Sequence, residues 1–87
     1  MKRVYKAVAF GEEIECTEWT NRRGELHRWF GPAFTNEEGL KIWYRKDKLH
    51  RRWGPAYISG DGFQEWWRNG GFVKDSIDVE DAKEKRK

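Results

Sequence analysis

The chain has 87 residues, of which 38% are charged, with a formal net charge of +3 and a mean hydropathy of −1.09. A chain of this length forms one domain and buries only about 60% of the surface that its unfolded form exposes. Its six Trp, three Tyr and five Phe argue against disorder, because a few large side chains can build a small core. The single cysteine, Cys16, excludes an internal disulfide, and no apolar stretch is long enough for a membrane span or a signal peptide. We therefore expect a cytoplasmic protein that does not associate with membranes.

The predicted elements are short strands. Residues 3–10 form a strand that pairs as a hairpin with residues 12–19. Turn-forming residues then recur at 36–39, 59–62 and 69–71, and the segments between them are aromatic or β-branched. The Asn69-Gly70 pair is a strong hairpin signal, since both residues tolerate positive φ. This spacing predicts an all-β, antiparallel meander of six or seven strands over residues 1–74. Residues 75–87 form a charged tail, either a frayed helix or disordered.

An internal repeat runs through this meander. "LHRWFGPAF" at residues 26–34 returns as "LHRRWGPAY" at residues 49–57, so that His27 and His50 lie 23 residues apart. The same period aligns Trp43 with Trp66, and with one extra residue it aligns Trp19 with Trp43. We predict repeats at residues 17–39 and 40–62 and a truncated one at 63–74.

The repeated phrase resembles the MORN-like repeats of many phage, giant-virus and bacterial proteins. The resemblance covers residues 19–73 and depends on the His-Arg and Gly-Pro-Ala core. It implies β-hairpin units stacked into one elongated sheet and a binding or scaffold role. In those repeats the residue before Gly-Pro-Ala is commonly small or acidic, whereas here it is Phe30 and then Trp53.

The two histidines have two interpretations. Each His-Arg pair either joins its repeat to the next through hydrogen bonds or supplies the general acid and base of a metal-independent ribonuclease. Repeat symmetry favours the structural role, because catalytic groups have unequal tasks. Two histidines and one cysteine cannot provide four zinc ligands, and no cofactor-binding motif is present. We expect no enzyme, no metal and no cofactor, and assign the repeat motif a structural role: His27, Arg28, Gly31, Pro32, His50, Arg51, Gly54 and Pro55.

The tryptophans form a predicted ladder. Strand alternation places Leu40, Ile42 and Tyr44 in the core and Lys41, Trp43 and Arg45 on the opposite face. Trp19 and Trp66 align with Trp43 by the repeat. This ladder either stacks unpaired bases beside a phosphate-binding rim or is covered by the N-terminal strand or the C-terminal tail, with Lys and Arg stems packing over it, and the structural alternative is favoured.

Further aromatic residues follow each His-Arg pair. We expect Phe30 and Trp53 to fill gaps between repeats, and Trp29 and Arg52 to be exposed, since those two positions differ between otherwise equivalent segments.

The charge distribution favours a polyanionic partner. Residues 41–54 contain six basic residues and one acidic residue. We therefore predict a small RNA-binding accessory protein. Its predicted binding residues are Arg22, Arg23, Trp29, Lys41, Trp43, Arg45, Lys46, Arg51, Arg52, Trp66 and Arg68.

The resemblance further implies a phage-encoded protein, acting in the host cytoplasm, that neutralises a defence factor such as a toxin ribonuclease. The alternative is a protein–protein inhibitor module without a role for nucleic acid, and a ribonuclease using His27 and His50 comes third. The acidic residues between Glu12 and Glu18 form a solvated face or pair with the basic segment of a second copy, which leaves self-association open.

Overall fold

The computed structural model describes residues 1–77, and every named element in them is a β-strand. The all-β prediction is therefore confirmed. The strands are β1 (Lys2–Ala9), β2 (Glu12–Trp19), β3 (Phe34–Asn36), β4 (Lys41–Ile42), β5 (Tyr44–Arg45), β6 (Lys48–Leu49), β7 (Tyr57–Ile58), β8 (Gln64–Arg68) and β9 (Gly71–Asp75).

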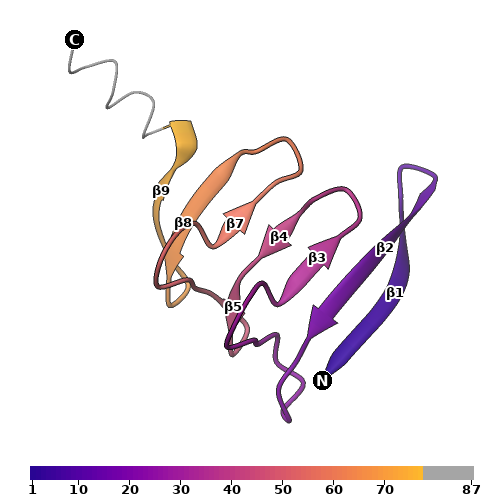
Figure 1. Cartoon of the computed structure of the whole chain (residues 1–87), viewed down its shortest axis with the longest axis horizontal. Coiled ribbons are helices and arrows are strands. Elements are labelled where there is room, and N and C mark those ends of the chain that lie inside the picture. Colours follow the sequence, from indigo (N-terminus) through magenta and orange to yellow (C-terminus); the bar gives the residue numbers. More distant parts are fainter. Residues whose placement is uncertain (78–87) are drawn as a thin grey trace.

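Seven of these strands form one antiparallel sheet in the order β1-β2-β3-β4-β7-β8-β9, as Figure 1 shows. Each strand pairs with the one before it, except where β5 and β6 leave the sheet and form a separate hairpin between β4 and β7. The predicted hairpin of the first two strands is present, with Lys2 opposite Trp19 and Ala9 opposite Glu12. The meander predicted from the turn spacing is thus confirmed.

Besides the β1–β2 turn, where Phe10 and Gly11 have φ of 53° and 79°, two further turns close hairpins with both central residues at positive φ. Asn69 and Gly70 join β8 to β9 with φ of 48° and 83°. Lys46 and Asp47 join β5 to β6 with φ of 49° and 65°. Positive φ at both positions matches the right-handed twist of the paired strands. Asn and Gly adopt it readily, which is why the Asn69-Gly70 turn was visible in the sequence and the Lys46-Asp47 turn was not.

The most buried residues are small. Ala33 and Ala56 have no exposed surface and Cys16 is 5% exposed. Each alanine lies between two neighbouring segments: the N–H of Ala33 donates to Ile42 and its carbonyl accepts from Trp19. Ile42 is only half-buried, and so is Tyr44, so the prediction that they form a buried core is wrong. The strand carrying them is interrupted at Trp43, so alternation does not continue along it.

Stacked cations take the place of a large aliphatic core. The described residues contain seven pairs in which a Lys or Arg lies over an aromatic ring. About one such pair per 70–80 residues is usual. In each pair the charged group itself lies over the ring, between 3.9 and 5.7 Å from the ring centroid. This explains how so charged a chain supports a folded sheet.

The two repeated segments make the same hydrogen bonds. The N–H of His27 donates to the Trp19 carbonyl, as the N–H of His50 does to the Trp43 carbonyl.

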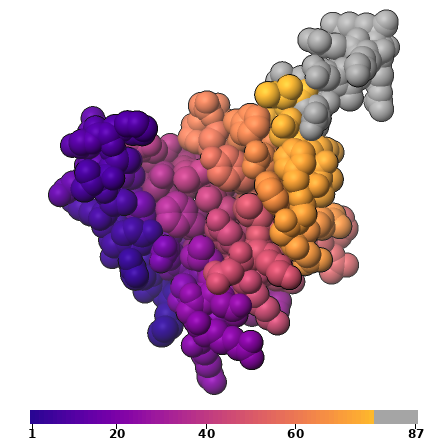
Figure 2. Space-filling model, turned by 180° about the vertical axis from the view of Figure 1, so that it is seen from behind, coloured from indigo at the N-terminus to yellow at the C-terminus, as the bar shows by residue number. Residues whose placement is uncertain are grey.

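Seen from behind, successive segments of the chain lie side by side across the molecule in sequence order, from indigo to yellow (Figure 2). The resemblance and the number of repeats stay predictions.

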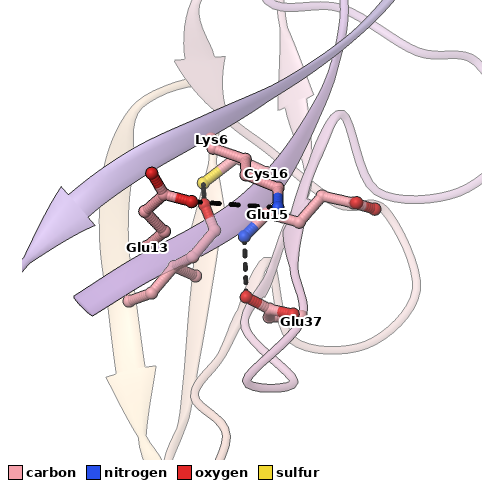
Figure 3. Close-up of polar contacts among 6 residues, drawn as sticks. Lys6, Glu13, Glu15, Cys16 and Glu37 are labelled. Carbon is pink, nitrogen blue, oxygen red and sulfur yellow. Dashed lines mark hydrogen bonds and ion pairs between the residues drawn. The ribbon is translucent and has the colours of Figure 1, made fainter.

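The acidic stretch of β2 anchors the next turn. The N–H of Glu15 donates to Glu37 Oε1 at 2.8 Å, and the N–H of Glu37 donates to the Glu15 carbonyl at 3.0 Å. Figure 3 shows the first of these bonds beside the ion pair of Lys6 with Glu13, 3.8 Å long. Three of the four glutamates, Glu12, Glu13 and Glu15, are exposed. Their exposure is compatible with both interpretations, a solvated surface and pairing with a second copy, so the choice between them stays a prediction.

The C-terminal boundary lies slightly later than predicted, because β9 extends to Asp75. The predicted charged tail lies mostly outside the described residues. Within residues 1–77, no helix is long and apolar enough to cross a membrane.

Candidate nucleic-acid interface

A groove of about 460 Å³ lies between the two connections that follow the histidines. One wall comes from the segment after His27 and the other from the segment after His50, and Arg45 of β5 lies between them. The groove is lined by Arg28, Trp29, Phe30, Gly31, Trp43, Arg45, His50, Arg51, Arg52 and Trp53.

The aromatic residues of both walls are exposed to solvent. Trp29 is 66% exposed, Phe30 89% and Trp53 77%. The exposure of Trp29 and Arg52 agrees with the sequence prediction. The prediction that Phe30 and Trp53 fill gaps between repeats is wrong.

Arginines fill the space in which those two aromatics were expected. A Cβ at Gly31 would lie 3.1 Å from the Arg28 guanidinium, and one at Gly54 would lie 3.1 Å from that of Arg51. Since each guanidinium lies directly against its glycine, the aromatic residue before that glycine has no room beneath it. Phe30 and Trp53 therefore remain in solvent.

Arg28 and Arg51 are held in place on the protein itself. The Arg51 guanidinium lies 4.0 Å from the Trp43 ring centroid and donates to the Pro55 carbonyl at 3.1 Å. Arg28 does the same with Trp19, at 3.9 Å, and with the Pro32 carbonyl, at 3.2 Å. Burial lowers the pKa of Arg51 below its ordinary value, although an arginine stays charged near neutral pH. The motif arginines thus hold the fold together at the floor of the groove.

Arg45 and Arg52 are the available cations of the groove. Both are exposed, and Arg45 lies over Trp29 at 4.6 Å and Arg52 over Trp53 at 5.6 Å. Within residues 1–77, neither guanidinium has a hydrogen bond or an ion pair. Each exposed tryptophan is thereby paired with an arginine whose donors face water. Such pairs offer a surface for stacking and a charge for phosphate.

Both histidines use Nδ1 to receive a backbone N–H from the following turn. His27 Nδ1 accepts from Lys46 at 3.2 Å, and His50 Nδ1 accepts from Asn69 at 3.0 Å. An Nδ1 that accepts leaves the proton of the neutral ring on Nε2. Burial, with smaller effects from Arg45 and Arg68, lowers the pKa of His50 and favours this neutral form. Each histidine is thus bonded to a turn 19 residues later in the chain, and this bond agrees with the structural interpretation of the His-Arg pairs.

The tryptophan ladder is half-buried and covered by cations. Arg28 covers Trp19, Arg51 covers Trp43, and Lys74 lies over Trp66 at 5.0 Å. This arrangement agrees with the structural alternative in that Lys and Arg side chains cover the rings, but among the described residues only Lys2 of β1, over Trp19 at 5.7 Å, comes from the N-terminal strand that was expected to provide the cover. A base cannot stack on the covered face of Trp43 while Arg51 stays in place.

The other predicted binding residues lie outside this groove. Arg22, Arg23 and Lys46 line a second hollow together with Asn21 and Glu25. Trp66 and Arg68 line a third, which shares Arg52 and Trp53 with the groove and adds Gly54, Val73 and Lys74. Lys41, on β4, lines none of the three. Lys74 was not predicted, and its place opposite Trp66 follows from strand register, which no local signal in the sequence gave.

Comparisons of the chain with protein-family models, with characterised proteins and with solved structures yield no match.

Proposed function

We propose that this protein binds single-stranded RNA through the groove between Trp29 and Trp53. The observation that carries the proposal is that each exposed tryptophan lies beside an arginine. Within residues 1–77, the guanidinium of that arginine makes no hydrogen bond and no ion pair. Single-stranded nucleic acid needs both elements, because its bases stack on aromatic rings while its phosphates contact cations.

The charge of the groove favours a nucleic acid over a protein partner. None of its lining residues is acidic, and four are arginines. Protein interfaces also use Trp and Arg, but they generally surround an apolar centre with charges of both signs. Here both tryptophans lie beside cations and are exposed to solvent. A flexible, negatively charged strand fits that composition.

A binding titration at increasing salt tests the proposal. A fluorescently labelled, mixed-sequence RNA without hairpins is titrated with the protein, and anisotropy gives the dissociation constant. The logarithm of the affinity should fall linearly with the logarithm of salt concentration, with a slope of about −0.7 for each phosphate contacted. Binding that is absent at low salt, or that does not change with salt, would contradict RNA binding and would favour the protein–protein module.

Matched variants locate the site. Trp53→Ala should weaken binding by about 1–3 kcal/mol if one base stacks there. Phe10→Ala is the control, since Phe10 is a fully exposed aromatic in the β1–β2 turn, outside the groove. Equal losses in both variants would show that binding does not occur in the groove. The phage-encoded, defence-neutralising role implied by the resemblance remains a proposal for later tests.

A further inference from the structure

The polar side chains that line the groove are all hydrogen-bond donors. Arg28, Arg45, Arg51 and Arg52 carry only N–H groups, and the indoles of Trp29 and Trp53 are donors as well. The hollow near Arg22 differs, since Asn21 and Glu25 supply acceptors there.

The one lining side chain with an acceptor atom has already used it. His50 Nδ1 accepts the N–H of Asn69, so its remaining nitrogen, Nε2, carries a proton in the neutral ring. The fold thus removes the only side-chain acceptor from the groove. An N–H donor of a bound ligand therefore finds no free side-chain acceptor in the groove.

We infer that the groove selects guanine among unpaired bases, by contacting the edge formed by N7 and O6. This inference rests on the proposed RNA binding. The edge presents two adjacent acceptors, which match the two parallel N–H groups of one arginine. The same edge of adenine has an acceptor at N7 and a donor at N6, and that donor would face the N–H groups of the arginine in place of an acceptor.

Arg45 and Arg52 are the arginines placed to make this contact. Each lies over an exposed tryptophan and has a guanidinium without a hydrogen bond or an ion pair within residues 1–77. A base that stacks on the free part of the indole therefore brings its edge close to a guanidinium. Arg28 and Arg51 are occupied by proline carbonyls and contribute charge.

The test compares RNAs that differ only at the purine edge. Short uridine-rich RNAs of identical length carry adenine, hypoxanthine, guanine or 7-deazaguanine at the same internal positions, and their dissociation constants are measured by anisotropy. Replacing adenine by hypoxanthine exchanges the N6 amino group for O6, and it should tighten binding about 5-fold or more. Guanine RNA should bind about as tightly as hypoxanthine RNA. RNA with 7-deazaguanine, which lacks N7, should bind only slightly more tightly than adenine RNA.

Protein variants separate base reading from charge. Arg45→Lys and Arg52→Lys keep the charge but lose the planar pair of donors, so one of them should lower the affinity for guanine RNA more than that for adenine RNA and thereby remove the preference. Arg22→Lys, outside the groove, should keep the preference.

The outcomes distinguish this inference from the function on which it rests. Equal affinity for all four RNAs would overturn guanine selection and leave RNA binding in place. Failure of every RNA to bind would overturn both. A preference that survives in both lysine variants would also overturn the assignment, because the discrimination would then arise outside Arg45 and Arg52.

Discussion

The guanidinium of Arg51 lies over Trp43, 4.0 Å from its ring centroid, and it also donates to the Pro55 carbonyl. Arg28 and Trp19 repeat this relationship in the preceding segment. The contact joins the tryptophan, which lies at the end of β2 or between β4 and β5, to the connection that carries the Gly-Pro-Ala phrase. We regard it as the main structural role of the repeated His-Arg sequence.

Replacing Arg51 with lysine should destabilise the fold. Lysine keeps the positive charge, but it cannot both stack as a planar group and reach the Pro55 carbonyl with a directed N–H. We expect a loss of about 1–3 kcal/mol in the free energy of unfolding, measured by urea denaturation followed through tryptophan fluorescence. Arg52→Lys is the control at an exposed site and should change stability by less than about 0.5 kcal/mol. Equal effects of the two substitutions would contradict the structural role of Arg51.

Gly54→Ala should cost more than Gly62→Ala. Both glycines have positive φ, 107° and 95°, so alanine strains the backbone at either position by about 1–3 kcal/mol. A Cβ at Gly62 meets open space, whereas one at Gly54 lies 3.1 Å from the Arg51 guanidinium. The difference in the free energy of unfolding between the two variants, measured by urea denaturation, therefore gives the cost of displacing Arg51.

A double-mutant cycle checks this explanation. In the Arg51→Ala background the penalty of Gly54→Ala should fall toward that of Gly62→Ala, because the group it displaces is gone. An unchanged penalty would mean that backbone strain alone accounts for the effect.

Acid should weaken the fold through His50. Because burial lowers the pKa of His50 in the folded state, the unfolded chain binds the proton more readily. The stabilisation is fully present above the unfolded pKa of about 6.5 and is lost as the pH falls below it. Protonation also converts Nδ1 from an acceptor to a donor, which breaks its bond with the Asn69 N–H.

Thermal melting between about pH 7 and pH 5 measures this effect, compared with His50→Gln, which does not titrate there. The melting temperature of the unmodified protein should fall more steeply with acid than that of the variant. Parallel curves would show that other groups cause the acid sensitivity.

Enlarging either buried alanine should destabilise the sheet. Ala33 and Ala56 have no exposed surface, so leucine at either position must displace neighbouring strands, at a cost of about 1–3 kcal/mol. The two equivalent positions should show similar losses in urea denaturation. Val8→Leu, at an exposed site on β1, should be nearly neutral. A tolerated leucine at only one of the alanines would show that the two segments are packed differently.

The sequence by itself determined the strands and much of their pairing. Turn residues at Gly11 and at Asn69-Gly70 carry their conformational preference locally, so the first and last hairpins could be predicted. The period between His27 and His50 likewise predicted equivalent bonds, since identical local sequences favour identical local structure. The exposure of Trp29 was predicted as well.

The repeat had predicted that Arg52 is exposed, but only the tertiary structure showed what holds Arg51 and leaves Arg52 available for a ligand. Arg51 and Arg52 are neighbours of the same type, yet one is fixed on Trp43 and a carbonyl and the other is exposed. The stacking depends on how the chain returns across the sheet after β6, and no spacing in the sequence shows it. The exposure of Phe30 and Trp53 has the same cause, because arginines fill the space against Gly31 and Gly54 that those aromatics were expected to occupy. Which side chain occupies such a space depends on packing, because the residues around it come from segments far apart in the sequence.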